Sequence, residues 1–123
     1  MELFDDISFK TSRLVTKTYS TSFSIAVSFL NEDMQRAICS IYGFVRFADE
    51  IVDTFHHVNQ KLVLDSFERD YYEAIENGIS LNPVLHSFAL TIKQYNIPAH
   101  LIEAFLKSMR TDLNKNLYHN NNE

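Results

Sequence analysis

Glycine, proline and cysteine are scarce in this sequence, and each scarcity excludes a class of structure. The 123 residues include 2 glycines and 2 prolines, and 46% of them are hydrophobic, so the chain has little turn chemistry for a β-sheet and is expected to be all-α. Cys39 is the single cysteine; this excludes an intrachain disulfide and a cysteine zinc cluster, and it fits a reducing compartment. The length predicts a single helical domain over residues 1–123.

Long hydrophobic runs and excess positive charge are also missing. No stretch of about 18 apolar residues occurs, and the acidic residues 1–6 are unlike a signal peptide, which together predict a cytoplasmic protein. The net charge of -5, from 16 acidic and 11 basic residues, argues against nucleic acid as a partner. If an acidic protein such as this one binds a diphosphate, a metal ion is needed to bridge the carboxylates and the phosphate oxygens.

Helix-capping residues mark where the expected helices begin and end. Asn31 and the pair Asn82-Pro83 are N-terminal signals, because an Asn side chain accepts from free backbone N–H groups and proline fits the first turn. Gly78 is a C-terminal signal, since glycine adopts the left-handed conformation that ends many helices. The hydroxyl residues 20–22 should break the first helix. The expected helices are residues 6–19, starting after Asp5 or Asp6, then 32–55, 61–77, 83–94 and one that Pro98 opens.

An Asp-x-x-x-Asp pair, Asp49 and Asp53, interrupts otherwise apolar, helix-period sequence. Carboxylates four residues apart share a helix face with Cβ atoms roughly 5–6 Å apart, and such like charges destabilise a helix unless a cation neutralises them. Mg²⁺ suits this position, because it binds through one or two carboxylates plus substrate phosphate oxygens. At about 100° per residue, the same narrow stripe holds Tyr42, Arg46, Asp49 and Asp53.

Two interpretations of this stripe are open. A broad apolar arc covers most of the helix and leaves only Gly43, Glu50 and a few others on the polar side, which predicts a mostly buried helix. In the first interpretation, Arg46 forms an ion pair with Asp49 or Asp53 on a solvated face. In the second, which the narrow polar side favours, the two aspartates hold Mg²⁺ and Arg46 binds a diphosphate oxygen.

With Glu50 added, the pattern has five residues: Tyr42, Arg46, Asp49, Glu50 and Asp53. The order is Tyr, three residues, Arg, two residues, an Asp-Asp/Glu pair, two residues and Asp. It resembles the first aspartate-rich motif of the squalene and phytoene synthases, which join two prenyl diphosphates head to head. The resemblance implies an all-α helical bundle that forms part of the class I isoprenoid synthase fold.

Two further segments are similar to the same family. Residues 19–24, Tyr-Ser-Thr-Ser-Phe-Ser, resemble its serine-rich segment, which closes around the diphosphate and the first prenyl chain. Residues 109–113, Met-Arg-Thr-Asp-Leu, resemble a segment with an Asp-Leu pair on the next helix of the cavity. Helix capping by the serines and core packing by the phenylalanine are the structural alternative. The resemblance implies catalytic roles for Asp49, Asp53, Arg46 and Tyr42, metal binding by Asp49 and Asp53, and substrate binding by Ser20, Ser22, Phe23 and Asp112.

The reaction that the resemblance implies is metal-assisted loss of diphosphate, with joining through a cyclopropylcarbinyl intermediate. The implied cofactor is Mg²⁺ or Mn²⁺, and the implied partner is a prenyl diphosphate. Squalene-type products, which need NADPH for a reductive step, and phytoene-type products both stay open. A lipid product implies peripheral membrane association.

The second aspartate-rich motif of the family is missing from these 123 residues. We therefore expect the chain to be the N-terminal half of a longer catalytic domain, and its exposed apolar faces to favour self-association. The polar, Asn-rich residues 114–123 are either terminal disorder or the point where a longer protein has been cut. The alternatives to a prenyltransferase are a non-catalytic helical interaction module and, less favoured, an all-α Mg²⁺-dependent pyrophosphohydrolase.

The missing motif leads to a first prediction. The purified chain, given Mg²⁺ and prenyl diphosphate, should yield no squalene- or phytoene-type product, because ionising an allylic diphosphate requires metal ligands from opposing helices. Mass spectrometry of the extracted lipids checks this. Detectable product would show that the chain is a complete synthase.

Overall fold

Helices account for the regular structure in residues 2–121, the part of the chain that this computed structural model describes. No strand occurs among these residues, which confirms the predicted all-α class. The six helices are α1 (Glu2–Tyr19), α2 (Thr21–Val27), α3 (Glu32–Asp53), α4 (Gln60–Asn77), α5 (Pro83–Tyr95) and α6 (Ala99–Asn121).

The predicted capping residues lie at the helix ends. Asn31 precedes α3, and its side chain accepts a hydrogen bond from the Met34 N–H at 2.9 Å. Asn82 caps α5 in the same way, directly before Pro83. Gly78 follows α4 with a left-handed φ of 74°. These local signals confirm the predicted boundaries within about two residues.

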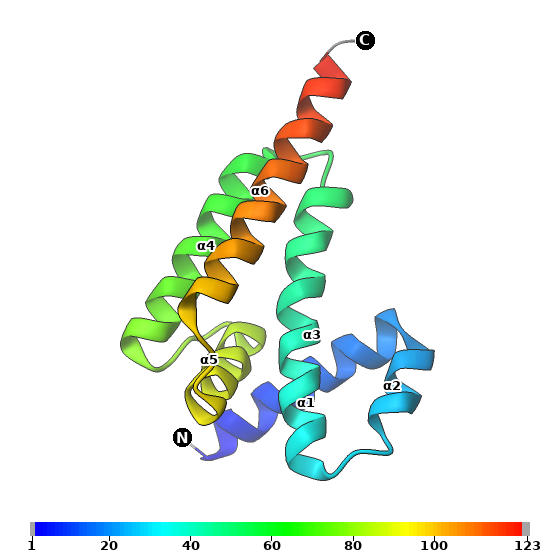
Figure 1. Cartoon of the computed structure of the whole chain (residues 1–123), viewed down its shortest axis with the longest axis vertical. Helices are drawn as coiled ribbons and strands as arrows, with labels where there is room; N and C mark the ends of the chain where they lie inside the picture. Colours follow the sequence, from blue (N-terminus) through cyan, green and yellow to red (C-terminus); the bar gives the residue numbers. More distant parts are fainter. Residues whose placement is uncertain (1, 122–123) are drawn as a thin grey trace.

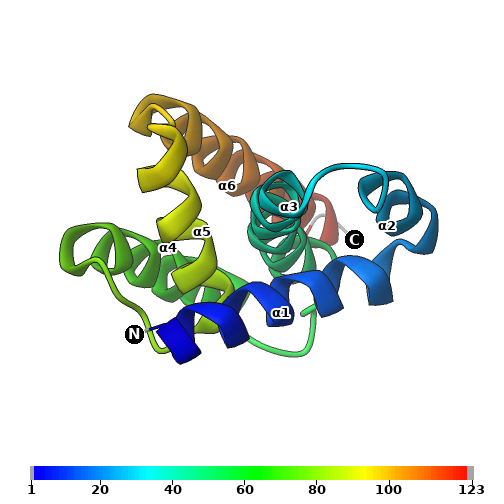
Figure 2. The same cartoon turned by 90° about the horizontal axis from the view of Figure 1, so that it is seen from below.

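α3 lies at the centre of the molecule and contacts each of the other five helices. α4 and α6 run alongside it (Figure 1). α1 crosses α3 and α5, as the view from below shows (Figure 2). A helix packed on so many sides has only a narrow strip left for charged side chains, so the neighbours of α3 decide where a polar site can form.

Phe44 of α3 is the centre of the hydrophobic core and is 1% exposed. Its ring stacks on Phe88 of α5 with centroids 4.1 Å apart, and on Phe67 of α4 at 5.2 Å. It also contacts Tyr71 of α4 and Phe105 of α6, at 5.5 and 5.7 Å. Aromatic pairs at these distances add about 0.5–1.5 kcal/mol each beyond the burial of their area, so one side chain joins four helices.

α1 packs through hydroxyl side chains rather than apolar ones. Ser8, Ser12 and Thr16 are all 0% exposed. The Ser8 and Thr16 hydroxyls donate to carbonyl oxygens one turn earlier in α1, at 2.7 and 2.9 Å. Ser12 shares a 2.7 Å hydrogen bond with Ser87 of α5. Because each hydroxyl has a partner, this face is buried without an unsatisfied polar group.

Gly43 of α3 faces this hydroxyl surface, contrary to its expected place on the polar side. A Cβ at Gly43 would lie 3.3 Å from both Ser12 Oγ and Val84 Cγ1, which is tighter than ordinary van der Waals contact. The prediction is wrong because a helical wheel sorts residues by hydrophobicity and places glycine with the polar ones. In the structure, α1 and α5 cover Gly43. The missing side chain lets both helices approach α3 closely.

The start of α1 also differs from the prediction. α1 begins at Glu2, and Asp5 lies inside the helix instead of capping it. The Asp5 carboxylate binds Nε2 of His86 at 2.6 Å, while His86 Nδ1 accepts from the Ser80 N–H at 3.2 Å. This pairing requires the tautomer with its proton on Nε2. A fully buried histidine thus tethers the first turns of α1 to α5.

α6 extends into the polar tail. It continues to Asn121, so the disorder interpretation is wrong for residues 114–121, and residues 122–123 lie outside the described part. Leu113 is 0% exposed and Leu117 packs against the core, because apolar residues recur four positions apart. None of the helices in residues 2–121 combines the length and apolar composition that a membrane span requires.

A side chain at position 43 should push α1 away from α3. We expect Gly43→Val to lower the free energy of unfolding by about 1–3 kcal/mol, the usual cost of overpacking a tight contact. Urea unfolding followed by circular dichroism measures this. Ala104→Val, at an exposed position of α6, is the control and should cost at most about 0.7 kcal/mol through helix propensity alone. Equal losses in the two variants would argue against close packing at Gly43.

Candidate functional site

The predicted stripe lies along one edge of α3, and its exposure changes along the helix. Tyr42, Arg46 and Asp49 are half-buried. Asp53, the last residue of α3, is exposed. Successive members are three or four residues apart, so the stripe extends over about 16 Å at 1.5 Å per residue. The four residues predicted to be catalytic therefore share one face.

Arg46 is held by two neighbours that the sequence prediction did not pair with it. Its Nη2 donates to Glu50 Oε2 at 3.1 Å, so Glu50, rather than Asp49 or Asp53, is its ion-pair partner. Its guanidinium also lies over the ring of Tyr19, 4.9 Å from the centroid. The contact with Tyr19 places the guanidinium against the last residue of α1.

The cluster around Arg46 has one unmet hydrogen-bonding group. Arg46 Nε is buried and has no hydrogen-bond partner among the described residues, and a buried donor without an acceptor is costly. Burial first, and a hydrogen bond to the Glu50 carboxylate second, raise the pKa of the Tyr19 phenol. Tyr19 therefore stays neutral as a donor to Glu50, and Arg46 Nε has no acceptor among the described residues.

The surroundings of Asp49 disfavour the charged form of its carboxyl group. Burial raises the pKa of its carboxyl, Arg46 opposes that rise, and the charges of Asp53 and Asp112 add to it. Asp112 belongs to α6, so the packing of α6 on α3 brings a third carboxylate toward the pair. A desolvated carboxylate with like charges beside it is stabilised by a cation.

The serine-rich segment meets the stripe at Tyr42. Phe23 of α2 stacks on the Tyr42 ring with centroids 5.3 Å apart, so residues from two separate motifs lie together. Ser20 is the N-cap of α2, and its hydroxyl oxygen accepts from the Phe23 N–H at 3.2 Å, as the structural alternative predicted. Ser22 is exposed on α2, and no hydrogen bond joins its side chain to the other described residues.

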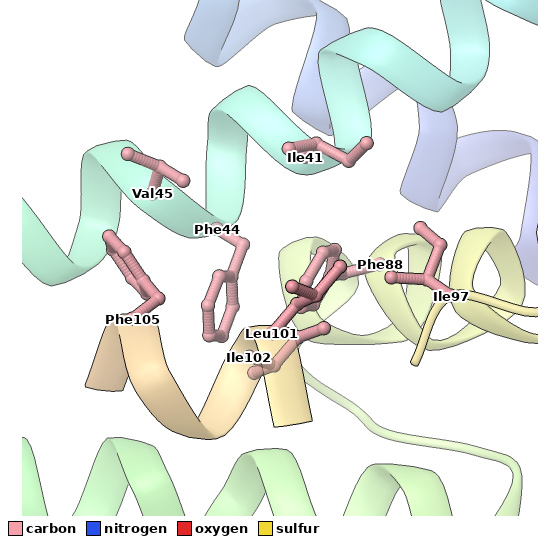
Figure 3. Close-up of a pocket in the computed structure, with 8 residues that line it drawn as sticks. All are labelled: Ile41, Phe44, Val45, Phe88, Ile97, Leu101, Ile102 and Phe105. Carbon is pink, nitrogen blue, oxygen red and sulfur yellow. The ribbon is translucent and has the colours of Figure 1, made fainter. Parts of the chain in front are cut away.

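An apolar cavity lies beside the stripe, between α3, α5 and α6. Its volume is about 220 Å³, and Figure 3 shows the rings of Phe44 and Phe105 side by side between α3 and α6. A second hollow of about 270 Å³ reaches the stacked pair at the stripe. The two hollows share Ile41 and Val45. The apolar surface is therefore continuous from the core to the stripe.

The acidic residues fit a metal ion that is shared with a substrate. Within residues 2–121, no group of three His, Cys, Asp or Glu side chains lies close enough to hold an ion alone. Asp49 and Asp53 offer two carboxylates, which matches Mg²⁺ bound through one or two carboxylates, water and phosphate oxygens. The unpartnered Nε of Arg46 on the same stripe suits an oxygen of the same phosphate.

Comparison with known proteins identifies first the fold and then the family. The crystal structure of squalene synthase HpnC from Alicyclobacillus acidocaldarius matches with a TM-score of 0.73 and 23% sequence identity, over 89% of this chain and 40% of that chain. The fold is thus the all-α isoprenoid synthase fold, as predicted, and the chain spans about 40% of the length of this relative. The squalene/phytoene synthase family model matches residues 16–123. The chain belongs to this family.

Two contacts of the site were not predicted from the sequence. Glu50 stands four residues after Arg46, and opposite charges at this spacing pair on a helix, so local spacing was sufficient to find it. Tyr19 reaches Arg46 only through the crossing of α1 and α3. No local pattern encodes that crossing.

The Asp49 carboxylate should destabilise the chain at neutral pH. A raised carboxyl pKa means that its contribution to stability is present below the ordinary aspartate pKa and is lost as pH rises through the raised value. In metal-free buffer, Asp49→Asn should therefore unfold at higher urea concentration than the unmodified chain at about pH 7, with the difference shrinking by about pH 4. Glu73→Gln, at an exposed site of α4, should show no such pattern. A lower urea midpoint for Asp49→Asn at neutral pH would show that the Asp49 carboxylate does not destabilise the chain.

Proposed function

We propose that this chain provides one wall of the active site of a prenyltransferase that joins two prenyl diphosphates head to head. The observation that carries the proposal is the arrangement on one edge of α3, where Arg46, Asp49 and Asp53 share a single stripe. That stripe borders a continuous apolar surface. A prenyl diphosphate has the matching parts, an anionic head and an apolar chain. Membership of the squalene/phytoene synthase family supports the same reaction class.

The charged residues of the stripe would hold the head group. Asp49 and Asp53 would bind Mg²⁺ or Mn²⁺, which when bound stabilises the charge on the departing diphosphate. Arg46 would donate to a diphosphate oxygen through Nε, while Glu50 keeps its Nη2 in place. Asp112 would add negative charge from α6 and so increase the attraction for a divalent cation.

The prenyl chain would lie along the apolar surface between α3, α5 and α6. Ile41 and Val45 line both hollows and would contact the chain along its path from the stripe to the core. The stacked rings of Phe23 and Tyr42 would stand where the head group meets the chain. An apolar lining excludes water, which would otherwise react with a carbocation.

One wall is insufficient for the reaction. No second Asp-x-x-x-Asp occurs in the 123 residues, and a single carboxylate pair binds Mg²⁺ through few protein ligands. The chain by itself should bind metal and diphosphate without joining two substrates. Apolar side chains at the cavity are also exposed, with Leu101 at 53% and Ile41 at 38%, which favours self-association.

Binding of a prenyl thiodiphosphate, an analogue that resists loss of diphosphate, tests this proposal. Titration calorimetry with the 123-residue chain should show binding that requires Mg²⁺. Asp49→Asn and Asp53→Asn should each weaken binding about tenfold or more, as expected when groups that support a metal are lost. Glu73→Gln should bind like the unmodified chain.

Two outcomes would count against the proposal. Binding without Mg²⁺, or binding of equal strength in all variants, would favour the non-catalytic helical interaction module. Inorganic diphosphate should bind through the same head-group residues but more weakly, because it leaves the apolar surface uncovered. Equal affinity for the prenyl thiodiphosphate and for inorganic diphosphate would show that the apolar surface does not take part in binding.

A further inference from the structure

α6 carries two charged residues on nearly opposite sides. Arg110 and Asp112 are two positions apart, which places their side chains about 200° apart around the helix. α6 contacts both α3 and α4. Arg110 contacts α4, so Asp112 lies on the side of α6 turned away from α4. There its charge helps to raise the pKa of Asp49 on α3, which packs against α6.

Arg110 joins α6 to two acidic residues of α4. Its Nη1 donates to Asp65 Oδ1 at 2.6 Å, and its Nη2 donates to Glu68 Oε2. Asp65 and Glu68 are three residues apart and therefore share one face of α4. A planar guanidinium with each arm bound to a different residue fixes the rotation of its helix as well as its distance from the neighbour.

Unlike Arg110, Asp112 is not held by hydrogen bonds from its side chain to a neighbouring helix in the described part of the chain. It is exposed, and its carboxylate accepts no hydrogen bond from the other described residues. The core residues of α6 near it, Leu106 and Leu113, are 2% and 0% exposed. Apolar contacts hold α6 on the core, but they are non-directional. The direction of Asp112 therefore depends on what fixes the rotation of α6.

We propose that Arg110 is a positioning residue for the metal–diphosphate site. By bridging Asp65 and Glu68, it holds α6 in the rotation that keeps Asp112 directed toward Asp49. This inference rests on the proposed function, in which Asp112 strengthens the binding of a divalent cation. Arg110 does not itself contact the substrate, because both arms of its guanidinium are engaged on α4.

The Arg110 network can be changed without unfolding the chain. The side chains of Arg110, Asp65 and Glu68 are 30%, 49% and 27% exposed, and ion pairs of this kind contribute little to stability. The aromatic core around Phe44 does not involve them. A loss of binding in these variants therefore reports on the site and not on the fold.

Mn²⁺ with inorganic diphosphate is the probe, and electron paramagnetic resonance measures its binding to the 123-residue chain. Arg110→Gln should weaken binding about tenfold, the usual cost of removing a group that orients a metal-site residue. Asp112→Asn should also weaken it. The double variant should bind no more weakly than Asp112→Asn alone, because Arg110 acts through Asp112. The melting temperature should change little in each variant.

A second variant tests whether the anchoring of Arg110 matters, rather than its charge. Asp65→Asn combined with Glu68→Gln keeps the charge of Arg110 but removes its anchors, so it should lose binding to the same extent as Arg110→Gln. Arg69→Gln is the matched control, because the Arg69 guanidinium donates to Ser66 on its own helix at 3.2 Å. It should bind like the unmodified chain.

Additive losses in the double variant of Arg110 and Asp112 would overturn the inference. Normal binding by the variant of Asp65 and Glu68 would overturn it as well. Either result leaves the proposed function standing, since the unmodified chain still binds the probe. If the unmodified chain binds no Mn²⁺ with diphosphate, the proposed function is wrong, and the inference is wrong with it.

Discussion

The burial of α3 among all the other helices is the constraint on which the rest of the structure depends. Phe44 occupies one side of α3, where its ring contacts α4, α5 and α6. Gly43 occupies another side, where an added Cβ would lie 3.3 Å from both Ser12 of α1 and Val84 of α5. Arg46 and Asp49 lie on the edge between these packed surfaces. The packing that builds the core thus also decides where charged groups stand on α3.

Burial has different consequences for a core tyrosine and for Asp49. In the core, burial raises the pKa of Tyr71 to about 12, so that phenol stays neutral and its burial brings no charge into the aromatic cluster. At the stripe, burial and then the neighbouring carboxylates raise the pKa of Asp49, while Arg46 opposes that rise, so the charged form of this group costs stability. Proteins depart from good packing rules chiefly at functional sites and offset the cost elsewhere. The stacked rings around Phe44 contribute stability elsewhere in the same bundle.

Sequence signals that act over a few residues predicted much of the fold and of the site. Asn31 caps α3 through a hydrogen bond three residues away, and the stripe follows from helical periodicity alone. Contacts between distant segments could not be predicted in this way. Asp5 binds His86 across 81 positions, so its apparent role as a cap was wrong. The place of Arg46 on the stripe was predictable from helical periodicity, but its stacking on Tyr19 depends on where α1 crosses α3.

In the proposed site, Asp49 and Asp53 hold a divalent cation together with a diphosphate. A crystal structure of the chain grown with Mg²⁺ and inorganic diphosphate tests it most directly. We expect an ion about 2.0–2.1 Å from carboxylate oxygens of one or both aspartates, with a diphosphate oxygen within hydrogen-bonding distance of Arg46 Nε. Diphosphate bound elsewhere on the chain, or an ion coordinated by neither aspartate, would contradict it.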